Sequence, residues 1–233
     1  MSDHIVESIS SVYKRISHAA MRAGRDPLEV KLVAVTKMVP PEAIREAVDA
    51  GVRLLGESRV QEAKEKIAVL SGVLPDTVSW HMIGNLQSNK AKLAVQLFDM
   101  IQSVDSVDLA KRIDRYASEA GKIQRLLVQV KLAGGESRSG ISPEGLIALL
   151  EEVGNLHNLV VEGLMTIPPF LETPEDVRPY FRRLREIRDG AEEKGFKLPE
   201  LSMGMSGDFE VAVEEGATMV RVGSAIFGRR LYQ

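Results

Sequence analysis

The sequence contains no cysteine, and that absence excludes several kinds of protein. It leaves no disulfide framework, no Cys-ligated zinc or iron–sulfur cluster, and no thiol nucleophile. Long apolar runs are missing too, because the uncharged stretches fall far short of the roughly 20 residues that span a bilayer. The opening segment, MSDHIVESISSVYKRI, lacks the apolar core of a secretory signal. We therefore expect a cytoplasmic protein with no membrane partner.

The chain has no large excess of positive or negative residues. Its 30 Lys and Arg residues against 33 Asp and Glu residues give a formal net charge of −3. Such a balance offers no general basic surface, so we expect no nucleic-acid partner. The histidines show no metal-ligand spacing, and we expect no metal site; they are His4, His18, His81 and His157.

What the sequence does contain is a regular alternation of short β-rich runs and amphipathic helical stretches. Residues 1–23 precede it and are expected to form a helix, because apolar residues recur at helical spacing from Ile5 to Ile16 and Gly24 is a typical stop. The expected strands are Lys31–Val35, Leu54–Leu55, Val78–Ile83, Met100–Val104, Leu126–Val130, Val160–Ile167, Leu201–Met203 and Met219–Val222. The expected helices between them are Pro41–Ala50, Val60–Leu70, Lys90–Leu97, Ser106–Ala120, Ser142–Val153, Thr173–Lys194 and Phe209–Glu215, and a short apolar segment follows the last strand.

Eight strand-then-helix units after one leading helix, with continuously apolar strands, indicate a parallel sheet that is buried on both faces. Eight units also favour closure, so we predict a (β/α)8 TIM barrel with an extra N-terminal helix, as a single domain over residues 1–233. A doubly wound open sheet is the alternative, because the second and seventh strands are short.

Lys37 follows the apolar strand Lys31–Val35. Active sites of (β/α)8 barrels lie at the C-terminal ends of the strands, so a lysine there points into the barrel mouth. Partial desolvation disfavours the ammonium form and exposes a nucleophilic amine, which a Schiff base requires. The alternative is a lysine whose amine extends to solvent from a strand end.

Small residues follow the last two strands, as Ser206-Gly207 and Gly223-Ser224. TIM barrels often bind phosphate at this place through backbone N–H groups, and glycine lets the backbone approach the anion closely. Ordinary turn glycines explain either pair taken alone. The two pairs together favour a phosphate site.

Arg221 lies two residues before Gly223, so the alternation of a strand puts both on the same face. An arginine that points into the barrel needs a partner, because an unpaired buried charge is unfavourable. A ligand atom would serve, and an internal ion pair with Glu57 is the alternative. A glycosidase pair drawn from Glu57, Asp105 and Glu162 has no local motif to support it.

Five segments form longer motifs: VAVTKMVPPEAIREAVDAGVRLLGESRVQEAKEK, WHMIGNLQSNK, GESRSGI, GLMTIPP and LSMGMSGDFEVAVEEGATMVRVGSAIFG. Together they resemble the pyridoxal-phosphate homeostasis protein family, over roughly residues 5–229. That family is similar in fold to the N-terminal barrel of alanine racemase. The resemblance implies the same barrel and a bound pyridoxal 5′-phosphate (PLP).

The resemblance also implies a role for each candidate residue. Lys37, in VAVTK, matches the family lysine that forms an internal aldimine with PLP. Ser206, Gly223 and Ser224 match the positions that hold the phosphate. Arg221 matches the residue that faces the pyridine nitrogen. No separate catalytic residue is implied.

Some positions depart from the family pattern or have no assigned role. Ser58 stands where the family usually has the asparagine of a GEN motif, so any contact made by that amide is in doubt. Arg138 replaces the usual lysine before Ser-Gly-Ile. The segment Asn85–Asn89 matches a family signature on the barrel rim whose role is not implied.

The expected function is that of a carrier with little turnover. Racemisation needs acid–base groups on both faces of the substrate, and the alanine racemases take the second from a C-terminal β domain. We expect no such domain here, because five residues follow the last motif. An arginine at the pyridine nitrogen also disfavours its protonation and weakens the ring as an electron sink. The tyrosines lie at helical or terminal positions: Tyr13, Tyr116, Tyr180 and Tyr232.

We therefore expect a monomer that binds PLP reversibly in intracellular cofactor homeostasis and passes it to apoenzymes. The first alternative is a single-domain PLP-dependent amino-acid racemase. A second is a Schiff-base aldolase that acts on a sugar phosphate without a cofactor. The colour of the purified protein separates the aldolase from the others, and turnover of chiral amino acids separates the carrier from the racemase.

Overall fold

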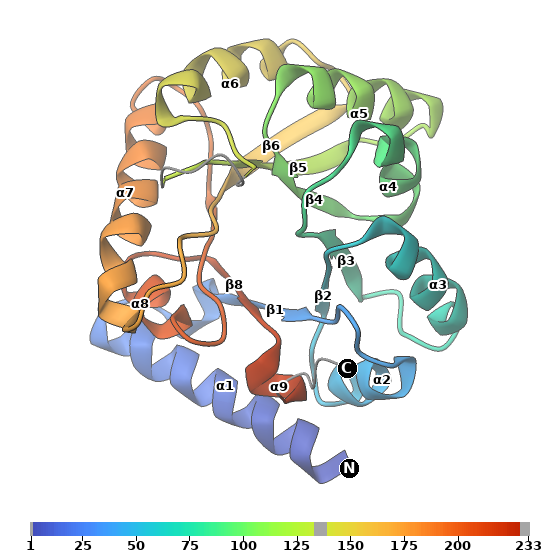
Figure 1. The fold of residues 1–233 in the computed structure, drawn as a ribbon, viewed down its shortest axis with the longest axis vertical. Helices are drawn as coiled ribbons and strands as arrows, with labels where there is room; N and C mark the ends of the chain where they lie inside the picture. Colours follow the sequence, from blue (N-terminus) through green and yellow to red (C-terminus); the bar gives the residue numbers. More distant parts are fainter. Residues whose placement is uncertain (1, 133–138, 229–233) are drawn as a thin grey trace.

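The strands form a closed ring in chain order, from β1 to β8 and back to β1. In the computed structural model, which describes residues 2–132 and 139–228, every neighbouring pair of strands is parallel. Figure 1 shows this ring viewed down its central axis. The strands are β1 Lys31–Val35, β2 Leu54–Glu57, β3 Ser79–Met82, β4 Met100–Val104, β5 Gln124–Gln129, β6 Leu159–Met165, β7 Glu200–Ser202 and β8 Met219–Val222.

Helices surround the ring on its outer side (Figure 1). They are α1 Ser2–Arg22, α2 Pro41–Asp49, α3 Val60–Leu70, α4 Ala91–Leu97, α5 Val107–Glu119, α6 Leu146–Gly154, α7 Pro174–Glu192, α8 Phe209–Glu214 and α9 Ser224–Phe227. Short 3-10 turns lie at η1 Pro27–Glu29, η2 Ser88–Lys90 and η3 Pro143–Gly145. The predicted (β/α)8 barrel with an added N-terminal helix is confirmed.

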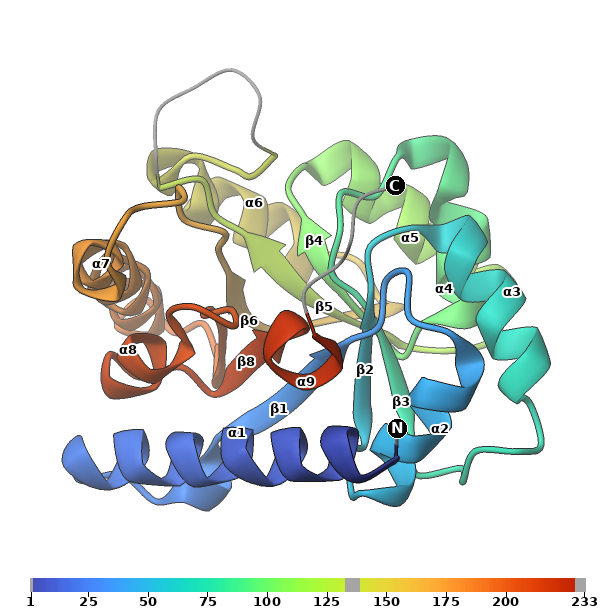
Figure 2. The ribbon, with the colours of Figure 1, turned by 60° about the horizontal axis from the view of Figure 1, so that its bottom comes forward.

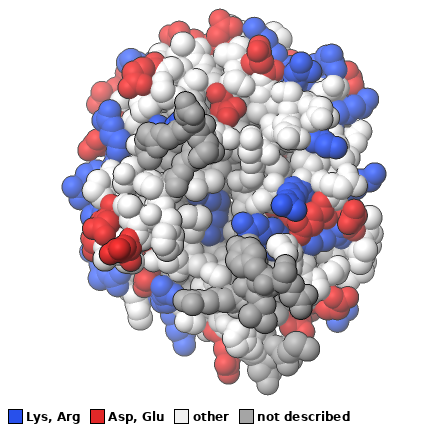
Figure 3. Space-filling model, in the orientation of Figure 1, with Lys and Arg blue, Asp and Glu red and all other residues white. Residues whose placement is uncertain are grey.

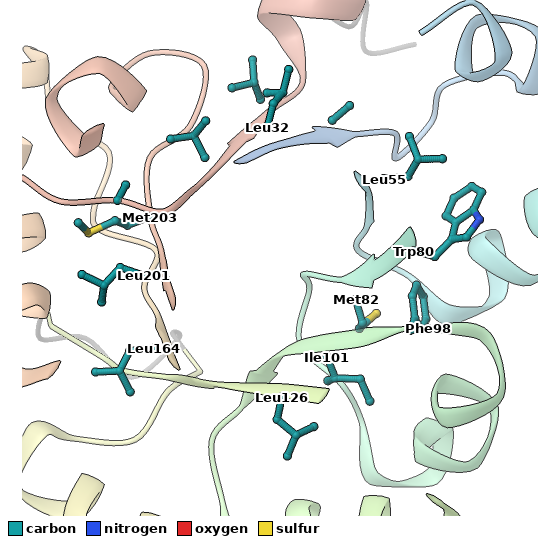
Figure 4. Close-up of a cluster of buried hydrophobic side chains, with 14 of the residues drawn as sticks. Leu32, Leu55, Trp80, Met82, Phe98, Ile101, Leu126, Leu164, Leu201 and Met203 are labelled. Atoms are coloured by element: carbon teal, nitrogen blue, oxygen red, sulfur yellow. The ribbon is translucent and has the colours of Figure 1, made fainter. Parts of the chain in front are cut away.

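The main core lies between the strands and the helices. Figure 4 shows Leu55, Trp80 and Leu126 pointing outward from the strand ring toward the helical layer, and all three belong to one large buried cluster. Alternate strand residues point inward and fill the barrel with a smaller apolar layer. That layer consists of Val33, Met100, Leu127, Met165 and Met219.

The leading helix α1 closes one side of the barrel wall. It contacts α2, α8 and α9, and Figure 2 shows it crossing below β1. Its buried face includes Ile9, Val12 and Ile16, as the helical spacing predicts. Gly24 lies two residues after the helix with a φ of +68°, a left-handed conformation that glycine adopts without strain.

Several boundaries differ from the sequence expectation. The fifth strand begins at Gln124 rather than Leu126, because the buried Gln124 amide donates to the carbonyls of Phe98 and Asp99, both at 3.2 Å. The helix expected over 142–153 starts as the 3-10 turn η3, which Ser142 caps and Pro143 opens, before α6 continues it. Polar and proline residues near an element's end decide these differences.

The end of the barrel interior at the strand N-termini is filled by ion pairs. The guanidinium of Arg125 on β5 donates to both carboxylate oxygens of Glu162 on β6, at 2.7 and 2.8 Å. Lys31 on β1 pairs with Glu200 on β7. We call these four side chains the closed-end pairs.

Within the described ranges, no helix has the length and apolarity to cross a membrane. Arg138, Tyr232 and most of the GESRSGI motif lie outside the described residues.

Candidate functional site

A cavity of about 520 Å³ opens at the C-terminal ends of the strands, and five candidate residues line it together. These are Lys37, Ser206, Arg221, Gly223 and Ser224. Figure 3 shows the corresponding face of the molecule hollowed near its centre, with basic side chains beside the opening. The structure thus brings residues from the ends of β1, β7 and β8 to one place, and their roles there remain predictions.

A neighbouring cavity of about 590 Å³ lies between α1, α2 and α9. It shares Val35, Gly223 and Ser224 with the first, but neither Lys37 nor Arg221 lines it. We place the candidate site in the 520 Å³ cavity, because there the groups that can react and the groups that can bind an anion face the same space.

The alternation of β1 places Lys37 on the cavity side. Val33 belongs to the layer inside the barrel, and Val35 lines the cavity. Thr36, between Val35 and Lys37, is buried and points away from the cavity, where its hydroxyl donates to Glu57 at 2.7 Å. Lys37 therefore continues the inward-facing series of its strand.

The loops after β7 and β8 are joined by hydrogen bonds. The Ser206 hydroxyl oxygen accepts from the backbone N–H of Gly223 at 3.1 Å and of Ala225 at 3.3 Å. Gly204 supports this loop with a φ of +92°, and its carbonyl accepts from the Arg221 N–H at 2.9 Å. A Cβ atom at Gly204 would lie 2.6 Å from that of Ala212, so both the conformation and the space require glycine.

This arrangement fits an anionic group. Two backbone N–H groups already point at an oxygen acceptor, and the Ser206 hydroxyl keeps its own proton to donate. Gly207 also lines the cavity, and a Cβ atom there would meet no other atom within 4 Å. The space and the donors beside Ser206 suit a phosphate.

Arg221 is 3% exposed, and its described hydrogen-bond acceptors are neutral. Its guanidinium donates to the Ser202 hydroxyl and to the Thr166 carbonyl, both at 2.7 Å. The alternative pairing with Glu57 is absent from the described contacts, because Glu57 bonds to Lys66 at 2.8 Å behind the barrel wall. Burial lowers the pKa of Arg221 to about 10, against the influence of Asp208, so the guanidinium stays charged at neutral pH.

A chain of buried hydrogen bonds continues from Arg221 across the barrel. The Ser202 hydroxyl donates to the Gln102 side-chain oxygen at 2.6 Å, and the Gln102 nitrogen lies 2.9 Å from Nδ1 of His81. A guanidinium only donates, so Ser202 must accept from Arg221 and donate onward. Nδ1 of His81 consequently accepts a hydrogen bond from Gln102, and the N–H proton of the imidazole ring lies on Nε2.

His81 is the end of this chain and is 1% exposed. Burial lowers its pKa to about 3, and the charges of Arg125 and Lys31 add to the effect. The imidazole is therefore neutral at ordinary pH, consistent with the direction of the hydrogen bonds. The sequence expectations considered His81 as a metal ligand and did not include Gln102 or Ser202. The signal for these two residues is a polar side chain at an inward position of the apolar strands β4 and β7.

Among the described lining residues, Asp208 is the acidic group of the cavity. Its carboxylate accepts from the Met205 N–H at 2.6 Å. Burial raises its pKa, although that hydrogen bond and the charge of Arg221 act in the opposite direction. Ser58, at the departure from the family pattern, also lines the cavity.

Known proteins resemble this chain over nearly its whole length. A family model described as the N-terminal domain of alanine racemase matches residues 9–230. A pyridoxal phosphate homeostasis protein of Aquifex aeolicus is 48% identical over 227 residues, which is 97% of this chain and 98% of that protein. The chain belongs to this family. Its member from Pseudomonas aeruginosa is 43% identical over 228 residues, covering 98% of this chain and 96% of that one.

Solved structures place the family on the same barrel. PipY of Synechococcus elongatus, solved with PLP bound, is 43% identical with a TM-score of 0.84, and the match covers 96% of this chain and 100% of PipY. An alanine racemase of Clostridium difficile has a TM-score of 0.73 at 17% identity. This match covers 98% of the present chain and 57% of the racemase, and it establishes a shared fold alone.

Proposed function

We propose that the chain binds PLP in the 520 Å³ cavity, holds it as a Schiff base with Lys37, and serves intracellular PLP homeostasis. One observation carries the proposal: Lys37, Arg221 and the Ser206 loop line the same cavity. The relationship to PipY, a family member solved with PLP bound, supports the choice of ligand.

Lys37 supplies the covalent contact. Its amine nitrogen adds to the aldehyde carbon of PLP, a C=N bond forms, and the aldehyde oxygen leaves as water with the two amine protons. Addition of water reverses the step and releases the aldehyde unchanged. A reversible bond of this kind suits a protein that stores a reactive aldehyde and gives it up again.

The two ends of PLP meet different groups. Ser206, Gly223 and Ser224 hold the phosphate, because hydroxyl and backbone N–H donors gather between the ends of β7 and β8. Arg221 donates to the pyridine nitrogen; two of its five N–H donors are used by Ser202 and Thr166.

A carrier with little turnover fits these surroundings better than a racemase. Arg221 stays charged, and a cation beside the ring nitrogen disfavours its protonation, so carbanions are poorly stabilised. Racemisation also needs an acid on each face. Tyr13, Tyr116 and Tyr180 are on the helices α1, α5 and α7, outside the strand ring.

The proposal extends to the setting of the chain. A single barrel domain over residues 1–233 acts as a cytoplasmic monomer and passes PLP to apoenzymes. Sedimentation of the purified protein with and without PLP tests the monomer. Mixing the loaded protein with a PLP-requiring apoenzyme, inside or outside a dialysis membrane, tests direct transfer.

Proton exchange separates carrier from enzyme. The PLP-loaded protein is incubated with L- or D-alanine in deuterated water, and the α-proton is followed by NMR. We expect negligible exchange and no racemisation, whereas turnover at roughly 1 s⁻¹ or faster would replace the carrier with a racemase. A protein that stays colourless with added PLP would contradict Schiff-base binding altogether.

A further inference from the structure

The peptide groups on both sides of Lys37 are held from behind the barrel wall. The carbonyl of Thr36, just before Lys37, accepts from the amine of Lys66 at 2.6 Å. The N–H of Met38, just after it, donates to the carboxylate of Glu62. Both partners are on α3, opposite the cavity side of β1.

A compact group of charges makes these contacts. The amine of Lys66 also donates to Glu57 at 2.8 Å and to Glu62 at 2.5 Å. Lys66 is only 8% exposed, so its charge requires these partners. We call Glu57, Glu62 and Lys66 the rear cluster. It joins the ends of β1 and β2 to the first turns of α3.

The rear cluster holds Met38 in an unfavourable backbone conformation. Met38 has a φ of +59°, and it is the non-glycine residue with positive φ in the described ranges. A left-handed backbone conformation is unfavourable for a residue that has a side chain. The Met38 side chain is 69% exposed, so its own packing does little to offset that cost, whereas the hydrogen bond to Glu62 acts directly on its N–H.

We propose that Glu62 and Lys66 are positioning residues that fix the backbone of Lys37 for attack on the aldehyde of PLP. The inference rests on the proposed Schiff base. It goes beyond it by naming residues that touch no part of the cofactor. With both flanking peptide groups fixed, the Lys37 side chain starts from one place on the cavity wall, and less freedom is lost when its amine meets the aldehyde carbon.

Removal of Glu62 is expected to affect covalent capture selectively. The phosphate donors come from the loops after β7 and β8, which make no described hydrogen bond to the rear cluster. A loosened Lys37 therefore leaves phosphate and ring recognition intact. A purely structural role for the cluster would instead disturb the whole cavity.

Two ligands distinguish these roles. PLP has the aldehyde, and pyridoxine 5′-phosphate has the same ring and phosphate with an alcohol that forms no Schiff base. In Glu62→Ala we expect PLP affinity to fall about tenfold and pyridoxine 5′-phosphate affinity to stay within about twofold. The matched control is Glu65→Ala on the exposed side of the same helix, which should change neither.

Equal losses for both ligands, or no loss for PLP, would overturn the positioning role. Glu62→Gln provides a second variant, because an amide oxygen still accepts from the Met38 N–H, and it should recover most of the PLP affinity. If Glu62→Ala does not fold, Glu62→Asp takes its place: its shorter side chain keeps a carboxylate beside Lys66 but withdraws it from the Met38 N–H, so the same selective loss for PLP is expected. The wild-type protein tests the foundation separately. If it binds PLP no more tightly than pyridoxine 5′-phosphate, the Schiff base itself is wrong.

Discussion

The two ends of the barrel interior hold charged side chains in opposite ways. At the strand N-termini the closed-end pairs match cation with carboxylate, Lys31 with Glu200 and Arg125 with Glu162. At the strand C-termini Arg221 is more deeply buried, yet the described acceptors of its guanidinium are a hydroxyl and a carbonyl.

The difference shows which end is complete without a ligand. Charges that neutralise each other stabilise the barrel and leave little to bind. A buried cation held by neutral dipoles still attracts an acceptor, and an unprotonated pyridine nitrogen supplies one without a second positive charge. Lys31 begins β1 at the closed end, and Lys37 follows β1 at the cavity end, so a substitution at either lysine tests the comparison.

The largest effect on PLP affinity is expected from Lys37→Ala, at the end of the barrel that holds the 520 Å³ cavity. Without the amine no Schiff base forms, and PLP affinity should fall about 100-fold or more. The free energy of unfolding without ligand should stay within about 0.5 kcal/mol, because Lys37 follows β1 and is not among the buried core residues. Absorbance titration with PLP and chemical denaturation measure the two quantities. Unchanged PLP binding would remove Lys37 from the site.

Ser224→Ala at the phosphate end should have the next largest effect. Loss of a hydroxyl donor to a charged phosphate should weaken PLP binding about tenfold. Pyridoxal, which lacks the phosphate, should bind as it does to the wild-type protein. Titration of both ligands into both proteins makes the comparison, and a similar loss for pyridoxal would contradict the phosphate assignment.

His81→Gln probes the chain that supports Arg221 between the two ends. Burial lowers the pKa of His81 to about 3 from its usual 6.5, so the unfolded chain binds the extra proton first as the pH falls. The neutral ring makes its whole contribution to the free energy of unfolding above about pH 6.5. That contribution declines toward pH 3, by up to about 1.4 kcal/mol per pH unit.

The variant should flatten the fall of unfolding free energy over this range, because glutamine does not titrate and its oxygen still accepts from Gln102. Denaturation between pH 7 and pH 4 measures the slope, with His157→Gln on the exposed surface as the matched control. An identical slope in wild type and His81→Gln would show that His81 binds its proton as readily in the folded protein as in the unfolded chain, and would contradict the lowered pKa.

The smallest effect is expected from Lys31→Ala at the closed end. Lys31 is half-exposed, and Glu200 keeps a hydrogen bond from Thr218 at 2.6 Å. The free energy of unfolding should fall by about 1 kcal/mol or less, and PLP affinity should stay unchanged. A loss of PLP binding here would break the separation of the two ends.

The barrel was predictable because its strands are apolar on both faces and recur with helices between them. That pattern depends on local sequence, as does the position of Lys37 just after β1. Ser206 and Gly223-Ser224 were predicted to lie together by the barrel rule alone, since parallel strands end at one edge. Their shared cavity agrees with that expectation.

The partners of buried charges were not predictable in the same way. An ion pair between Arg221 and Glu57 was the alternative expected from the sequence. In the structure Glu57 instead pairs with Lys66 on the outer side of β2. Adjacent residues of a strand point to opposite faces, and a shift of one position decides which charges meet. A signal was present in α3, where Lys66 shares the buried face with Val60, Ala63 and Leu70.

Chemical trapping tests the central claim most directly. The protein is loaded with PLP, reduced with borohydride, digested and analysed by mass spectrometry. We predict a yellow protein before reduction and a pyridoxyl group afterwards on the single peptide that contains Lys37. A label on another lysine, or a protein that remains unlabelled, would contradict the account.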